Sequence, residues 1–104
     1  MSDAVFAALA DPTRRAVVES LRGGRRSVGE IAAGLPVSRP AVSQHLKVLE
    51  GAALVRVEQE GTRRLYSLDP RGPAEARAWM DDVWDVALAR FALLAESTDP
   101  SPRS

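Results

Sequence analysis

Apolar residues in the stretch 27–50 fall into two short runs. Within each run they are spaced three or four residues apart, as on one face of a helix. Ile31 is followed four residues later by a leucine, and Val42, Leu46 and Leu49 form one stripe in the second run. Each stripe predicts a short helix with one buried face. The few residues between the runs leave room only for a tight turn, so this stretch predicts two helices joined at an angle.

Polar residues mark where both helices begin and where the first one ends. Ser27 followed by Glu30 is the pattern of a capping box, in which hydroxyl and carboxylate each satisfy a backbone amide. Gly34 ends the first helix, Ser38 is a second N-cap, and Pro40 falls in the first turn of the second helix. The stretch therefore predicts a helix-turn-helix, whose second helix enters the DNA major groove.

Two further helices are predicted before this motif. Residues 3–10 form a short amphipathic segment, and Asp11 followed by proline caps a second helix that runs to about Arg22. Arg14 and Arg15 oppose the dipole at the start of that helix. They are either solubilising charges, or contacts to a phosphate or to an acidic last helix.

A β-hairpin is predicted after the motif. Residues 54–58 alternate apolar and polar side chains, a turn follows at Glu60-Gly61, and residues 64–68 form the returning strand. Leu65 or Tyr66 packs on the helices in this interpretation. A hairpin in this place is a wing.

The tip of the wing carries Thr62, Arg63 and Arg64. Arginines there are placed for phosphates or for a narrow minor groove beside the site. The alternative is an ordinary solvated loop.

A long helix over residues 74–96 closes the chain. Its apolar residues make a stripe too wide for a helix that only rests on its own domain. We therefore expect a homodimer formed through the first and last helices. The expected interface residues are Val5, Phe6, Leu9, Trp79, Val83, Trp84, Ala87, Leu88, Phe91 and Leu94. The rival interpretation is a lid over a small-molecule pocket. Residues 97–104 are expected to be a disordered tail.

The polar face of the helix after Ser38 has base-reading chemistry. Arg39 can contact guanine O6 and N7, and Gln44 can pair with the edge of adenine. Ser43 suits a base or a phosphate, and Lys47 suits the phosphate backbone. The same residues would also serve an ordinary solvated helix face, but the small side chains at its start leave a groove accessible.

Charge distribution favours nucleic acid although the net charge is zero. Residues 13–71 hold 11 Arg and Lys against 6 Asp and Glu, so positive charge collects around the motif and the wing. The acidic C-terminal segment must then lie away from the DNA.

The composition narrows the classes of protein to which the chain could belong. At 104 residues the chain predicts one domain, here residues 1–96, and no apolar run or signal-peptide pattern indicates a membrane or secretion. The absence of cysteine removes disulfides and thiolate sites, so a cytoplasmic location is expected. No nucleophile–base pair or glycine-rich phosphate loop is present, which argues against an enzyme.

The motifs together resemble the ArsR family of bacterial winged-helix repressors. The resemblance is carried by ALADPTRRAVVESL (residues 8–21), LPVSRPAVSQHLKVLEGAALV (35–55) and EGTRRLYSLDP (60–70), and it extends over residues 3–96. It implies a dimer on a pseudo-palindromic operator that blocks transcription. The family's DNA-contacting positions fall on Arg39, Pro40, Ser43, Gln44, Arg63 and Arg64.

The sequence departs from the family's metal sensors. Residues 30–34 (EIAAG) lack the Cys-x-Cys motif, and His45 is the single histidine. Asp81, Asp82 and Asp85 fit a solvated face better than a cation site. No metal or other cofactor is expected.

The sequence thus predicts a mainly α winged helix-turn-helix whose function is sequence-specific repression, with autoregulation expected. Its partners are an operator duplex and a second copy of the chain; no small-molecule effector can be inferred. A winged-helix module for protein–protein contact is the alternative, in which the arginines bind an acidic partner. The expected DNA contacts are Ser38, Arg39, Pro40, Ser43, Gln44, Lys47, Thr62, Arg63 and Arg64.

Overall fold

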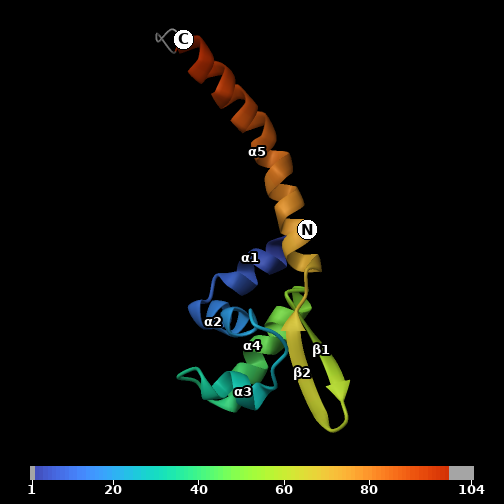
Figure 1. The fold of residues 1–104 in the computed structure, drawn as a ribbon. Helices are drawn as coiled ribbons and strands as arrows, with labels where there is room; N and C mark the ends of the chain where they lie inside the picture. The colour runs from blue at the N-terminus through green and yellow to red at the C-terminus, as the bar shows by residue number, and fades with distance from the viewer. Residues whose placement is uncertain (1, 99–104) are drawn as a thin grey trace.

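Five helices and one hairpin follow one another in the predicted order, in a computed structural model that describes residues 2–98. The elements are α1 (Asp3–Leu9), α2 (Pro12–Ser20), α3 (Val28–Ala33), α4 (Arg39–Gly51), β1 (Val55–Glu60), β2 (Arg63–Leu68) and α5 (Arg71–Thr98). Figure 1 shows α1 to α4 gathered with the hairpin at one end, while α5 projects from this body. The mainly α winged helix-turn-helix fold is confirmed.

The predicted helix starts are confirmed by their hydrogen bonds. The Asp11 carboxylate accepts from the Arg14 amide at 2.9 Å, so α2 begins one residue later. At α3 the capping box is complete: the Ser27 hydroxyl accepts from the Glu30 amide at 3.2 Å, and Glu30 Oε1 accepts from the Ser27 amide at 2.9 Å. These caps satisfy amides that have no partner inside the helix.

The end of α4 is formed by Gly51 and the two alanines that follow it. Gly51 is the last helical residue, and Ala53 takes the left-handed conformation, with φ of 55°. The Leu54 amide donates to the Leu49 carbonyl at 2.9 Å, and the Ala53 amide donates to the Glu50 carbonyl at 3.0 Å. This pair of bonds is a Schellman motif, in which Leu54 is buried beside the helix it ends.

The wing is a two-stranded antiparallel hairpin in which Val55 pairs with Leu68 and Glu60 with Arg63. Gly61 opens its two-residue turn with φ of 64°, a conformation that glycine adopts without a steric penalty. Both Leu65 and Tyr66 are buried, whereas only one of them was required by the prediction. Both strands are longer than predicted, because pairing extends to the turn.

The buried stripe of α4 lies at the centre of the core. Val42, Leu46 and Leu49 are fully buried, as expected from their spacing, and α1, α2, α3 and the hairpin pack around them. Val17 of α2 and Ile31 of α3 lie in the same cluster. The core therefore fixes the orientation of α4, and with it the direction of the helix face that points outward.

α5 begins at Arg71 rather than near residue 74, and it spans 28 residues, about 42 Å of helix. Its first turns pack on the body, where Gly72 and Ala76 are buried, and the rest extends away from it (Figure 1). The helix continues through Ser97 and Thr98, which were expected to belong to a disordered tail. Residues 99–104 of that expected tail lie outside the described residues.

Arg14 and Arg15 have a role that differs from both expectations. Arg14 Nε donates to the Ala8 carbonyl at 2.7 Å, and Arg15 donates to the Leu9 carbonyl at 2.7 Å. Both guanidinium groups thus bind the last carbonyls of α1, which the helix itself leaves without partners. The sequence could not show this, because it depends on how α2 folds back beneath α1.

No helix within residues 2–98 combines the length and the apolar character needed to cross a bilayer. Over the same range, histidine, aspartate and glutamate side chains form no group of three that could hold a metal ion.

Candidate nucleic-acid interface

α4 is held with one face in the core and the other in solvent. The Ser38 hydroxyl accepts from the Ala41 amide at 3.2 Å, and Pro40 occupies the first turn, so the helix start is well defined. The outer face is formed by polar side chains, by the small residues of the first turn and by Val48, which is exposed. All nine residues expected to contact DNA are exposed: Ser38, Arg39, Pro40, Ser43, Gln44, Lys47, Thr62, Arg63 and Arg64.

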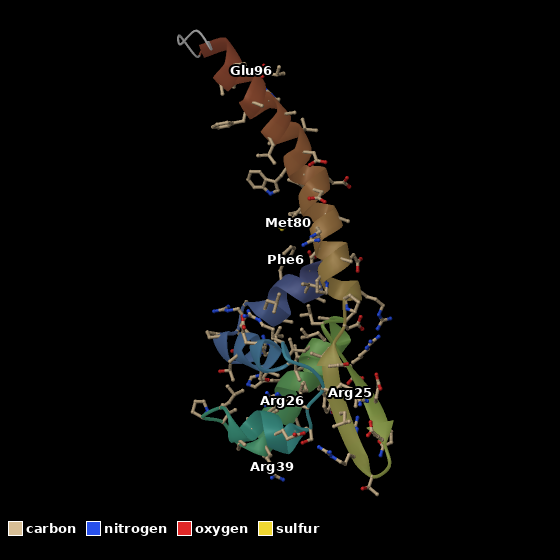
Figure 2. The ribbon with its side chains drawn as sticks, in the orientation of Figure 1. Phe6, Arg25, Arg26, Arg39, Met80 and Glu96 are labelled. Carbon is tan, nitrogen blue, oxygen red and sulfur yellow. The ribbon has the colours of Figure 1, made fainter. Side chains whose placement is uncertain are left out.

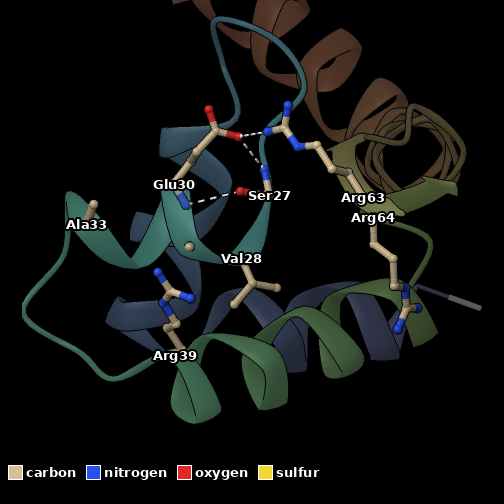
Figure 3. Close-up of a pocket in the computed structure, with 8 residues that line it drawn as sticks. Ser27, Val28, Glu30, Ala33, Arg39, Arg63 and Arg64 are labelled. Atoms are coloured by element: carbon tan, nitrogen blue, oxygen red, sulfur yellow. Dashed lines mark hydrogen bonds and ion pairs between the residues drawn. The ribbon is translucent and has the colours of Figure 1, made fainter. Parts of the chain in front are cut away.

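Arg39 is exposed, but its side chain lies against α3. A Cβ built on Gly29 would be 3.1 Å from Arg39 Nη2, so the guanidinium occupies the space that the glycine leaves open. Figure 3 shows Arg39 beside α3 at one end of an open hollow between the two helices and the wing.

Arg63 forms an ion pair with the capping box of α3. Its Nη2 lies 2.9 Å from Glu30 Oε1, the same oxygen that accepts from the Ser27 amide (Figure 3). The hydrogen bonds from Ser27 and the nearby charge of Arg63 lower the pKa of Glu30. The ion pair joins residues 33 positions apart, so sequence spacing gave no signal for it.

Arg64 is directed to the other side of β2. Its guanidinium lies over the Tyr66 ring, 5.9 Å from the centroid, at the distance of a cation–π contact. A second hollow is lined by Arg64 and Tyr66 of the wing together with Ser43, Lys47 and Glu50 of α4. The structure thereby brings the two predicted phosphate-binding residues of α4 beside a wing arginine.

Two arginines that the sequence analysis did not single out attach the wing to the body. Arg25 pairs with Glu58 at 3.4 Å and Glu60 at 3.0 Å, both on β1. Arg26 exchanges two backbone hydrogen bonds with Tyr66, in an isolated antiparallel β-bridge. Figure 2 labels Arg25 and Arg26, which lie beside the hairpin. These contacts link the wing to the segment that precedes α3.

The predicted dimer surface is exposed over most of its length. On α5, Trp84 is 53% exposed and Phe91 75% exposed. Phe6 of α1 meets Trp79 edge-on, with centroids 5.7 Å apart, and with Met80 it lines a groove between α1 and α5 (Figure 2). Leaving such large apolar side chains in water is unfavourable, so this face requires a cover.

One predicted interface residue is wrong. Val5 is 4% exposed and belongs to the core cluster of its own chain. The apolar pattern of a short amphipathic helix could not tell an internal contact from an external one. Phe6, its neighbour on α1, is the exposed residue.

Comparisons with known proteins agree with the fold. A family model described as a helix-turn-helix domain matches residues 9–58. The chain is 56% identical to an HTH-type transcriptional regulator of Mycobacterium tuberculosis, over 91% of this chain and 89% of that protein. It is 36% identical to the transcriptional repressor SdpR of Bacillus subtilis, over 73% of this chain and 84% of that protein.

A solved structure extends the similarity to the wing and the last helix. It is the solution structure of a homodimeric winged helix-turn-helix DNA-binding domain from Mycobacterium bovis, described as a possible ArsR-family transcriptional regulator. The TM-score is 0.64 at 30% sequence identity, and the match covers 84% of this chain and 81% of that one.

Proposed function

Because the chain belongs to the ArsR family of winged helix-turn-helix transcriptional regulators, we propose that it is a homodimeric repressor that binds an operator through α4 and the wing. The observation that carries the proposal is the placement of two unlike surfaces. Figure 1 shows α4 and the wing in the body at one end of the molecule and α5 projecting from the other. The exposed residues of α4 and the wing tip are mainly polar or basic, whereas those of α5 include large apolar side chains.

In this proposal α4 lies in the major groove. Arg39 leaves α3 to contact a guanine, and Gln44 contacts an adenine. Ser43 binds a base edge or a phosphate, and Lys47 binds the phosphate backbone. Ser38 and Pro40 allow close approach at the start of the helix, while Thr62, Arg63 and Arg64 place the wing over the flanking backbone and minor groove.

Dimerisation is proposed through α1 and α5, by analogy with the homodimeric structure from Mycobacterium bovis. The residues that cover one another across the two-fold axis are Phe6, Leu9, Trp79, Val83, Trp84, Ala87, Leu88, Phe91 and Leu94. Their burial removes the exposed apolar face from water. Two recognition helices related in this way meet half-sites centred about one helical turn, or a multiple of it, apart.

The acidic charges of α5 support this orientation. Asp81, Asp82 and Asp85 lie on the projecting helix, away from the wing and α3, so they do not oppose phosphate (Figure 1). Occupation of a pseudo-palindromic operator by the dimer blocks transcription from the overlapping promoter. We propose that the operator includes the DNA upstream of its own gene, and that the protein acts in the cytoplasm.

Fluorescence anisotropy tests the proposal, using the purified protein with its own upstream duplex and with a scrambled duplex over a salt series. We expect selective binding to the upstream duplex, with a steep loss of affinity as salt rises, because several phosphates are neutralised. Weak binding to both duplexes, with little salt dependence, would instead favour the alternative of a protein–protein interaction module.

A further inference from the structure

The two wing arginines are adjacent in β2 but serve different neighbours. Successive side chains of a strand point to opposite faces, and Figure 3 shows Arg63 reaching α3 while Arg64 turns toward α4. Arg64 shares its face with Tyr66, over whose ring it lies. Arg63 is thus paired with α3, while Arg64 borders the hollow beside α3 and also lines the hollow beside α4.

Arg63 is held by a carboxylate. Its contact with Glu30 Oε1 is 2.9 Å long, and that oxygen is itself fixed by the Ser27 amide. A phosphate brought to Arg63 would have to approach Glu30 as well, and like charges repel. The arrangement suits a residue that ties the wing tip to α3.

Arg64 lies in a setting suited to an anion. Besides Val28 of α3, the hollow between β2 and α4 is lined by Arg64, Lys47 and Ser43, which carry a guanidinium, an ammonium and a hydroxyl group. All three are groups that donate hydrogen bonds to phosphate oxygens. Glu50 lies in the same hollow and reduces its positive charge without cancelling it.

Resting on the proposed function, we infer that Arg64, Lys47 and Ser43 bind one phosphate of the DNA backbone between α4 and the wing. Arg63 is a positioning residue that acts through Glu30. The hollow thus links the recognition helix and the wing to a single point on the duplex, and the ion pair keeps the wing at the distance this requires.

Two double variants with unchanged net charge separate these roles. Glu30→Gln with Arg63→Ala removes the ion pair but retains an oxygen that can accept from the Ser27 amide, so the cap is kept. Glu50→Gln with Arg64→Ala removes one charge of each sign from the hollow. Both are compared with the wild-type chain by anisotropy on the upstream and scrambled duplexes over a salt series, after thermal unfolding shows that each is folded.

We expect Glu50→Gln/Arg64→Ala to bind both duplexes more weakly and to make the plot of log affinity against log salt less steep by up to about 0.9, the contribution of one phosphate, since Lys47 and Ser43 alone hold that phosphate less closely. Glu30→Gln/Arg63→Ala should keep the wild-type slope. Since Arg63 acts through Glu30, Arg63→Ala should cause no further loss of affinity when Glu30 is already glutamine. With Glu30 present, Arg63→Lys should bind close to the wild-type affinity, in contrast to Arg63→Ala.

A reduced slope for Glu30→Gln/Arg63→Ala, or an unchanged slope for Glu50→Gln/Arg64→Ala, would overturn this assignment while leaving the proposed function intact. A wild-type protein that binds neither duplex with salt dependence would overturn the proposed function itself, and this inference with it.

Discussion

The backbone of Gly72 lies directly against that of Ala53. The Gly72 amide donates to the Ala53 carbonyl at 2.9 Å, and a Cβ built on Gly72 would be 2.6 Å from that oxygen and 2.6 Å from the carbonyl oxygen of Ala52. Both obstacles are backbone atoms at the end of α4, which cannot move aside as a flexible side chain would. A residue with a side chain is therefore not accommodated at position 72, in the first turn of α5.

Gly72→Ala should lower the free energy of unfolding by about 1–3 kcal/mol, as expected for overpacking against fixed atoms. Urea unfolding followed by circular dichroism measures the change. Gly51→Ala is the matched control, because nothing lies within 4 Å of its added Cβ and the residue is helical. It should raise stability by up to about 1 kcal/mol. Equal stability of the two variants would contradict the close approach.

Ala53→Gly should stabilise the fold by roughly 0.5–1 kcal/mol, because an alanine in the left-handed region is strained and a glycine is not. Differential scanning calorimetry provides the measurement. A lower melting temperature for the variant would show that Ala53 does not adopt a positive φ.

Asp69 should make the free energy of unfolding depend on pH in the acidic range. Its carboxylate is 2% exposed and accepts hydrogen bonds from the side chain and the backbone amide of Arg71, which lower its pKa from 3.8 to about 2. A pKa lowered on folding stabilises the folded state above the ordinary value, and this contribution is lost as the pH falls toward 2.

Asp69→Asn should therefore be less stable than the wild type at neutral pH, and the difference should shrink between about pH 5 and pH 2. Urea unfolding at a series of pH values tests this. Asp82→Asn, at an exposed position on α5, serves as the control and should remain close to the wild type. A difference for Asp69→Asn that stayed constant with pH would argue against the Arg71 pair as its cause.

Trp84→Glu should convert the dimer into a monomer and abolish operator binding, because it places a charge in the middle of the apolar face of α5. Sedimentation velocity gives the oligomeric state. Ala89→Glu adds the same charge about 140° around the helix and should remain dimeric. If Trp84→Glu stays dimeric, the interface lies elsewhere.

Arg39→Ala should weaken operator binding by about 1–3 kcal/mol and relax the preference at one base position. Binding selection from a randomised duplex library measures both effects. A weaker but unchanged base profile would assign Arg39 to the phosphate backbone instead, and an unchanged affinity would show that its side chain remains on α3.

Local signals in the sequence predicted most of the fold. The caps at Asp11, Ser27 and Ser38 could be predicted because each depends on residues only three positions apart. The turn at Gly61 could be predicted from the backbone preference of glycine. The order of elements, and the family to which they belong, could thus be inferred before any coordinates. The sequence placed Val5 in the dimer interface, whereas it is buried within its own chain, because an apolar position on a short helix gives the same pattern in both cases.

The arrangement of charges could not be predicted in this way. Arg63 with Glu30, and Arg25 with Glu58, are each 33 residues apart, and they meet only after the hairpin folds back on α3. Side-chain chemistry identified the arginines of the wing as cations, but it could not tell which of them already has a carboxylate beside it. That distinction requires the register of the strands.

The hydrogen bond from Gly72 to Ala53 has a consequence for spacing. It joins the first turn of α5 to the residue two positions beyond the end of α4 through main-chain atoms alone, so in the proposed dimer the distance between the two recognition helices is set by a backbone contact and not by flexible side chains. Inserting or deleting a base pair between half-sites also rotates one of them around the duplex axis. Because this junction between α4 and α5 does not bend to follow that rotation, the proposed dimer discriminates between operators by the spacing of their half-sites as well as by their base sequence.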